Sequence, residues 1–191
     1  NAPRISDHHP PLELIDPEDI QQLEVIKGPA GSLYGNGNGG VLLLKSKVAA
    51  RNQHNVSSGF QAASYGGYRW NNSVALGFPS RGLRISHNWQ DYAGYRDQEF
   101  NRKQQVSLLF KQKISESQRI SIYGTYYSGN WGLPGALNEE QAQQQPQSAV
   151  PFSISNNAYL NRERYVAAIT HESSWLKHFN ERTVISYQKT N

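Results

Sequence analysis

The run at residues 20–47, IQQLEVIKGPAGSLYGNGNGGVLLLKSK, carries the strongest structural signal in the chain. Two short apolar runs, residues 23–26 and 41–44, predict short strands. The residues between them are rich in glycine and asparagine, which tolerate positive φ, so the sequence predicts a tight, irregular connection. Upstream, Asp16 followed by Pro17 is the pattern of a helix N-cap with proline at the first helical position, and it predicts one or two turns of helix.

Beyond residue 55 the hydrophobic pattern changes to a period of two. Apolar residues alternate with polar ones, which is typical of strands with one apolar and one polar face. The segments that alternate are residues 56–65, 70–78, 83–90, 105–111, 120–126, 165–169 and 183–187. The sequence therefore predicts about seven strands in this part of the chain.

The connections between these strands alternate in length, apart from a tight Gly66-Gly67. Residues 79–82 and 115–118 are short, whereas residues 91–102 and 130–161 are long, and residues 139–147 are a Gln-rich segment expected to be mobile. Outer-membrane barrels join their strands by short turns on one side and longer loops on the other. A soluble β-sandwich also has alternating strands, so the alternation by itself leaves both architectures open.

Composition excludes several classes of site. The 191 residues include no cysteine, which excludes disulfides and thiolate metal sites, and the net charge of +4 is too small and dispersed to predict a nucleic-acid partner. Residues 35–40 fit G-x-G-x-x-G, but an expected strand follows where a dinucleotide site needs a helix. We find no metal-ligand pattern, no catalytic constellation and no cofactor signal, and we expect no enzyme.

Residues 16–47 resemble the end of the plug domain of TonB-dependent outer-membrane receptors. The positions that match the family pattern include Gly28, Pro29, Leu33, Tyr34, Gly35, Gly39 and Gly40. Residues 91–96 and 132–137 are similar to early barrel loops of the family, so the resemblance covers essentially the whole chain. It implies a mainly β fold, with residues 1–50 as the C-terminal part of the plug and residues 51–191 as the N-terminal part of a transmembrane β-barrel of about 22 strands.

The resemblance implies a fragment of an active transporter in the outer membrane of a Gram-negative bacterium, with ferric siderophores as the leading substrate. Cobalamin, haem and oligosaccharide remain open as ligands, and a surface β-sandwich or adhesin-type binding module remains the alternative class. The implied partners are the outer-membrane lipid, the ligand, and TonB through a segment absent from this chain. About seven strands cannot close a barrel, so open edges predict self-association of an isolated fragment.

The resemblance also implies roles for individual residues. The candidate ligand contacts are His8, His9, Tyr92, Tyr95 and Trp131. Glu24 and Lys27 are candidate contacts between plug and barrel wall, and Lys27 stands where arginine is commoner in the family. For the ligand candidates an interfacial or packing role is an equal alternative, and for Glu24 and Lys27 the alternative is ordinary solvated charge.

Overall fold

The computed structural model describes residues 17–28, 40–176 and 179–191, and the chain divides into two compact units, Asn1–Lys47 and Val48–Asn191. Several residues singled out from the sequence lie outside the described residues. These are His8, His9, Asp16, Pro29, Leu33, Tyr34, Gly35 and Gly39.

The first unit contains the two strands predicted at residues 23–26 and 41–44. A 3-10 helix, η2 (Pro17–Asp19), leads into β1 (Ile20–Lys27), which pairs antiparallel with β2 (Gly40–Ser46). The backbone N–H of Lys47 donates to the carbonyl of Asp19 at 2.8 Å and joins the two ends of this hairpin. Gly28 and Gly40 have φ of 97° and 140°, conformations that favour glycine. A Cβ at Gly40 would also lie 2.5 Å from the carbonyl oxygen of Ile26.

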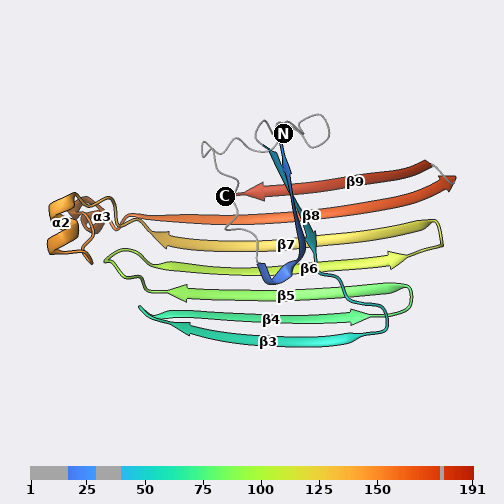
Figure 1. Ribbon diagram of the computed structural model, residues 1–191, viewed down its shortest axis with the longest axis horizontal. Coiled ribbons are helices and arrows are strands. Elements are labelled where there is room, and N and C mark those ends of the chain that lie inside the picture. Colours follow the sequence, from blue (N-terminus) through green and yellow to red (C-terminus); the bar gives the residue numbers. More distant parts are fainter. Residues whose placement is uncertain (1–16, 29–39, 177–178) are drawn as a thin grey trace. The chain divides into compact units, whose positions relative to one another are not determined.

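The second unit is a seven-stranded sheet in which every strand pairs antiparallel with the strand that precedes or follows it in sequence (Figure 1). The strands are β3 (His54–Ala63), β4 (Gly67–Gly77), β5 (Arg81–Tyr92), β6 (Asn101–Lys113), β7 (Gln118–Gly132), β8 (Tyr159–Leu176) and β9 (Phe179–Thr190). The seven predicted strands are thus confirmed. Within the described residues β3 and β9 are edge strands, each hydrogen-bonded to one neighbour, and such edges are open to further pairing.

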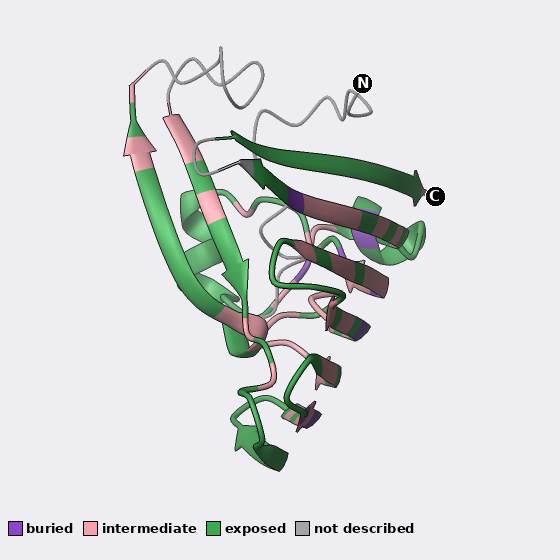
Figure 2. Cartoon of the chain, turned by 90° about the vertical axis from the view of Figure 1, so that its right-hand side faces the viewer, coloured by how far each residue is buried: buried purple, intermediate pink, exposed green. Residues whose placement is uncertain are grey.

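The sheet has one apolar and one polar face. Apolar and polar residues alternate along each strand, and side chains directly opposite each other on paired strands point to the same side. One row on the apolar face runs through Val74, Ile85 and Leu108, the next row toward the short turns contains Phe110 and Ile122, and a row nearer the long loops contains Trp70 and Trp89. These side chains are exposed or half-buried, with Val56 77% and Ile185 72% accessible, and no large side chain among the described residues is fully buried (Figure 2). The apolar face therefore has no covering layer in the described part of the chain.

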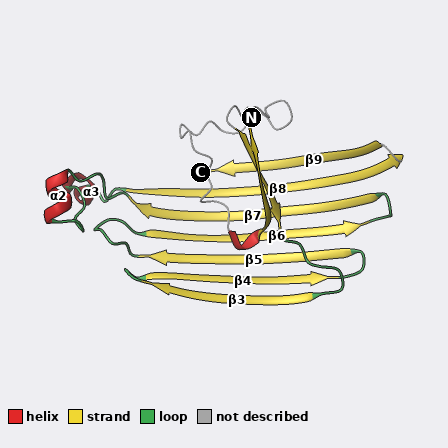
Figure 3. Ribbon diagram, in the orientation of Figure 1, coloured by secondary structure: helices red, strands yellow, loops and turns green. Residues whose placement is uncertain are grey.

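The long connections lie at one end of the sheet, the left-hand end in Figure 3, where the helices are. They are shorter than predicted, because the strands continue into them: residues 130–132 and 159–161 belong to β7 and β8, and Trp131 pairs with Leu160. The Gln-rich segment, which we expected to be mobile, contains a helix, α2 (Glu139–Gln144). Asn138 and Gln141 form a capping box at its N-terminus, which satisfies amides that would otherwise lack partners. A second helix, α3 (Pro151–Ser155), follows.

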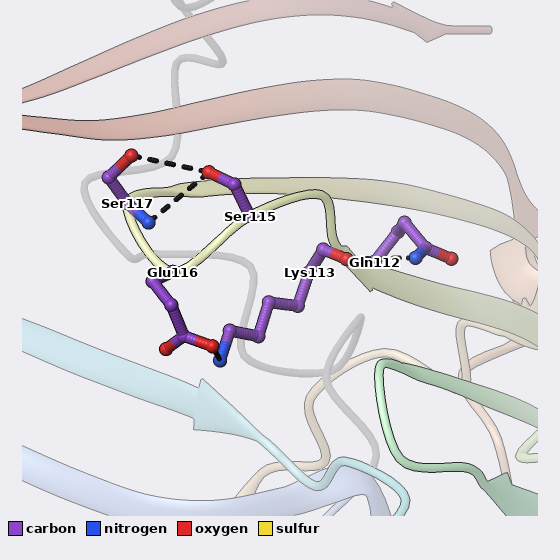
Figure 4. A network of polar contacts seen from close by, with 5 residues as sticks. All are labelled: Gln112, Lys113, Ser115, Glu116 and Ser117. Carbon is purple, nitrogen blue, oxygen red and sulfur yellow. Dashed lines mark hydrogen bonds and ion pairs between the residues drawn. The ribbon is translucent and has the colours of Figure 1, made fainter.

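The short β4–β5 and β6–β7 turns lie at the opposite end, whereas the short β3–β4 turn lies beside the long loops. The β6–β7 turn is held by its own polar side chains (Figure 4). The ammonium of Lys113 contacts Oε1 of Glu116 at 2.6 Å, and the backbone N–H of Ser117 donates to Oγ of Ser115 at 3.2 Å. The hydrogen bond from Lys113, helped by its charge, lowers the pKa of the Glu116 carboxyl.

No helix in the part of the chain that the structure describes is long and apolar enough to cross a membrane.

Candidate functional site

We define the loop-side wall as the polar-face residues of three register rows next to the long loops. The row nearest the loops contains Tyr92, Asn101, Trp131 and Leu160. The second row contains Gln61, Arg69, Gln90, Lys103, Gly129 and Arg162, and the third contains Gly59, Asn71, Asn88, Gln105, Tyr127 and Arg164. Four of these residues are cationic and none of these described residues is Asp or Glu. Because like charges on one face add their potentials, this wall favours an anionic ligand or partner.

Aromatic side chains accompany the cations in the middle of the loop-side wall. The rings of Tyr127 and Trp131 converge over Gly129, and the guanidinium carbon of Arg162 lies 5.8 Å from the centroid of the Trp131 ring. Tyr127 is 3% accessible, so its ring is held by its neighbours. A cation beside an indole ring is a favourable contact, and the pair presents both charge and an aromatic surface.

Hydrogen bonds between polar side chains stiffen the wall below this cluster. The amide of Gln105 donates to Ser107 at 3.2 Å and to Thr125 at 3.4 Å, and the two hydroxyls lie 3.1 Å apart. On the neighbouring strand Asn88 is 8% accessible and its Nδ2 atom has no hydrogen-bond partner. A buried amide nitrogen without a partner is costly.

The two long loops are bound to each other. The guanidinium Nε of Arg96, in the β5–β6 loop, donates to the carbonyl of Ser148 in the β7–β8 loop at 3.0 Å. The N–H of Asp97 donates to the carbonyl of Gln147 at 2.7 Å, and the amide of Gln98 donates to Oδ1 of Asn157 at 2.8 Å. These bonds hold a loop of eight residues, 93–100, against one of 26 residues, 133–158, so the rim beside the loop-side wall is ordered.

A glycine pair shapes the polar face at the short-turn end. Gly77 and Gly82 lie opposite each other on β4 and β5, and the backbone of residues 48–53 passes over them. The N–H of Gly77 donates to the carbonyl of Gln53 at 2.8 Å, and a Cβ at Gly77 would collide with the carbonyl oxygen of Ala50. The segment that leads from the first unit into β3 is therefore seated closely on the sheet.

The structure brings two of the predicted ligand residues to one row of the loop-side wall. Tyr92 and Trp131 both pair with Asn101. Their strands, β5 and β7, lie on either side of β6 and are therefore about 10 Å apart. Tyr92 also lines an open cavity of ≈ 150 Å³ together with Arg69 and Gln90. Trp131, expected in a loop, belongs instead to β7, because the pairing of β7 with β8 extends past it.

Tyr95 belongs to the β5–β6 loop, whereas Glu24 and Lys27 belong to the first unit. Tyr95 packs edge-on against Tyr65 in the β3–β4 turn, with ring centroids 5.1 Å apart. Glu24 accepts a hydrogen bond from Gln22 in its own strand at 2.7 Å, and Lys27 is exposed at the end of β1.

Sequence reasoning missed Lys103, Gly129, Arg162 and Arg164 as members of one surface. The signal that could have found three of them is the polar-face alternation of β6 and β8, whereas the row that joins them depends on strand register. The described residues contain no group of three or more His, Cys, Asp or Glu side chains that could hold a metal ion.

Comparison with known proteins gives consistent results for the two units. Residues 2–41 match the family model described as TonB-dependent Receptor Plug Domain. The chain also resembles the crystal structure of the ferric-catecholate import receptor Fiu from E. coli K12, with a TM-score of 0.69 to the open form over 90% of this chain at 18% identity. The TM-score to the closed form is 0.67 over 90% of this chain, at 17% identity.

The chain spans 29% of the open-form structure and 26% of the closed-form structure. Its first unit overlaps the match to the plug model, and its second unit has the fold of barrel strands in such a receptor. Residues 2–41 thus match the plug of TonB-dependent receptors in sequence, and the chain as a whole shares the fold of part of the Fiu structure.

Proposed function

We propose that the full-length protein is a TonB-dependent active transporter of the outer membrane that takes up ferric siderophores. The observation that carries this proposal is the loop-side wall, with four cations and no carboxylate among its described residues. We assign the chain no catalytic role.

The apolar face supports a membrane location. Its aliphatic and aromatic side chains form continuous rows across seven strands and are largely accessible. An uncovered apolar sheet of this size is unfavourable in water and favourable against lipid hydrocarbon. In a barrel the opposite, polar face lines the interior, which would place the cations in the path of the ligand.

The charge of the wall supports an anionic ligand, such as many iron chelates, over cobalamin and oligosaccharide. Many ferric siderophores are anions, whereas cobalamin and most oligosaccharides carry no net negative charge that four cations would attract. Fiu, whose fold this chain shares, is a ferric-catecholate import receptor. Tyr92 and Trp131 are the proposed ligand contacts on this wall, with His8, His9 and Tyr95 as further predicted contacts; Glu24 and Lys27 as plug-to-barrel contacts likewise stay a prediction.

The direct test is iron-limited growth of a Gram-negative host with the full-length gene deleted and restored, on a panel of ferric siderophores. We expect one chelate, or one chemical group of chelates, to support growth only when the gene is present. Deleting TonB from the restored strain has to abolish that growth. Unchanged use of every iron source would contradict the assignment to siderophores.

The partners of the isolated fragment follow from its open edges. We expect residues 1–191, expressed alone, to require detergent and to self-associate through β3 and β9, since both edges retain unpaired backbone groups. A monodisperse monomer in detergent-free buffer, measured by sedimentation, would instead favour a soluble sandwich module.

A further inference from the structure

Gly129 lies at the centre of the loop-side wall. On β7 its register partners are Lys103 in β6 and Arg162 in β8. Two residues before and after it on the same strand, Tyr127 and Trp131 point to the same face, because side chains alternate along a strand. Gly129 is thus flanked by a cation on each side and by an aromatic ring at each end.

The space above Gly129 is already occupied by these two rings. A Cβ at this position would lie 2.5 Å from Cζ3 of Trp131, 2.5 Å from the hydroxyl oxygen of Tyr127 and 2.9 Å from its Cζ. Such separations are far shorter than the roughly 3.5–4.0 Å at which carbon atoms make favourable contact. Any side chain at residue 129 must therefore displace both rings.

Of the two rings, Trp131 has more room to move. Tyr127 is 3% accessible and has little room to move, whereas Trp131 is half-buried. Moving the indole also moves it relative to the Arg162 guanidinium, which now lies 5.8 Å from the ring centroid. The absence of a side chain at Gly129 consequently holds the indole and the guanidinium in one geometry.

We infer that Gly129 is a specificity-determining position, which orients Trp131 so that the wall selects an anion carrying a flat unsaturated ring. The ring of such a ligand packs against the indole while its charge is met by Arg162 and Lys103 on either side of Gly129. An uncharged ligand without a ring gains neither contact. This inference rests on the proposed function, since it concerns the ligand that the transporter takes up.

Gly124 provides a matched control on the same strand. It lies on the apolar face, and a Cβ there would meet only the carbonyl oxygen of Val166, at 4.0 Å. Gly124→Ala and Gly129→Ala therefore make the same chemical change five residues apart, but only the second crowds the loop-side wall.

The experiment uses the purified full-length receptor in detergent and measures Kd by tryptophan fluorescence. The probes are the ferric complex of a tris-catecholate, an anion with aryl rings, and that of a tris-hydroxamate, uncharged and without aryl rings. We expect Gly129→Ala to weaken the tris-catecholate about tenfold, the scale of one lost aromatic contact. Gly124→Ala is expected to bind it as the wild type does, and the wild type to bind the tris-hydroxamate more weakly.

Equal affinity of Gly129→Ala and wild type for the tris-catecholate would overturn the inference while leaving the proposed function in place. A wild-type receptor that binds neither chelate and supports no gene-dependent iron uptake would overturn both. If Gly129→Ala does not reach the membrane, Trp131→Leu removes the ring without crowding. That variant has to show the same selective loss, and unchanged affinity would overturn the inference.

Discussion

Leu108 and Leu109 are neighbours in β6 that lie on opposite faces of the sheet, which makes them a matched pair for lysine substitution. Leu108 faces the apolar side between Ile85 and Gly124, whereas Leu109 faces the polar side, opposite Arg84. Both substitutions replace leucine by lysine in the same strand. The difference between them therefore measures the two environments rather than strand propensity.

The cost of Leu108→Lys follows from its position in the apolar band. Leu108 lies between Val106 and Phe110 along the same face and is 37% accessible in the sheet. In the proposed membrane location, lipid would cover what the strands leave open. A lysine on the lipid face near the bilayer centre costs about 2–4 kcal/mol. We expect about 3 kcal/mol, roughly a hundredfold in the folding equilibrium constant. For Leu109→Lys, whose ammonium stays on the polar face, we expect about 1 kcal/mol.

The assay is reversible folding of the full-length protein into phospholipid vesicles, with urea as denaturant and the fraction folded read from heat-modifiable gel mobility. Equal losses for the two variants, or a larger loss for Leu109→Lys, would refute the assignment of the faces. Wild-type folding to the same extent without lipid or detergent would refute the lipid-facing role itself.

Three further predictions concern the linker, the loops and the short turn. Gly77→Ala should lower the free energy of unfolding by about 1–3 kcal/mol, because the new Cβ overpacks against the backbone of residues 48–53. Gly59→Ala, with nothing within 4 Å of its Cβ, should leave the free energy of unfolding unchanged. Denaturant titration measures both variants. Arg96→Ala removes a charge-assisted hydrogen bond to the β7–β8 loop, so limited proteolysis should cleave residues 139–147 faster, and an unchanged cleavage rate would contradict the clamp. Because Lys113 lowers the pKa of Glu116 below its ordinary 4.5, the ion pair stabilises the turn above that pH and is lost as pH falls through the lowered pKa. Protection of the turn amides from hydrogen exchange, relative to the intrinsic exchange rate at each pH, should therefore fall below about pH 4.5 in the wild type but not in Glu116→Gln.

The strands could be predicted from the sequence because their signal is local. Residues such as Leu83, Ile85 and Trp89 alternate with polar neighbours, and a period of two identifies both the strand and the face. The predicted ends were wrong for β7 and β8, which extend by several residues into the predicted loop. Those ends are stabilised by pairing with each other, for example Trp131 with Leu160, and no pattern within a single strand reports that.

Helix α2 shows a different kind of miss. Its residues, Glu139 to Gln144, form a Gln-rich run without apolar periodicity, so composition favoured an unstructured segment. The missed signal was the capping box of Asn138 and Gln141, a spacing of three residues that begins helices.

The sequence by itself determined the division into a plug-like hairpin and an alternating sheet, and the face to which each side chain belongs. Both depend on residues close together in the chain. Only the tertiary structure decided that Lys103, Gly129 and Arg162 form one row, because strand register joins residues that are 26 and 33 positions apart in the chain. Shifting one strand by a single residue would send its cation to the apolar face, so the charge and aromatic geometry of the wall exist only once the strands have paired.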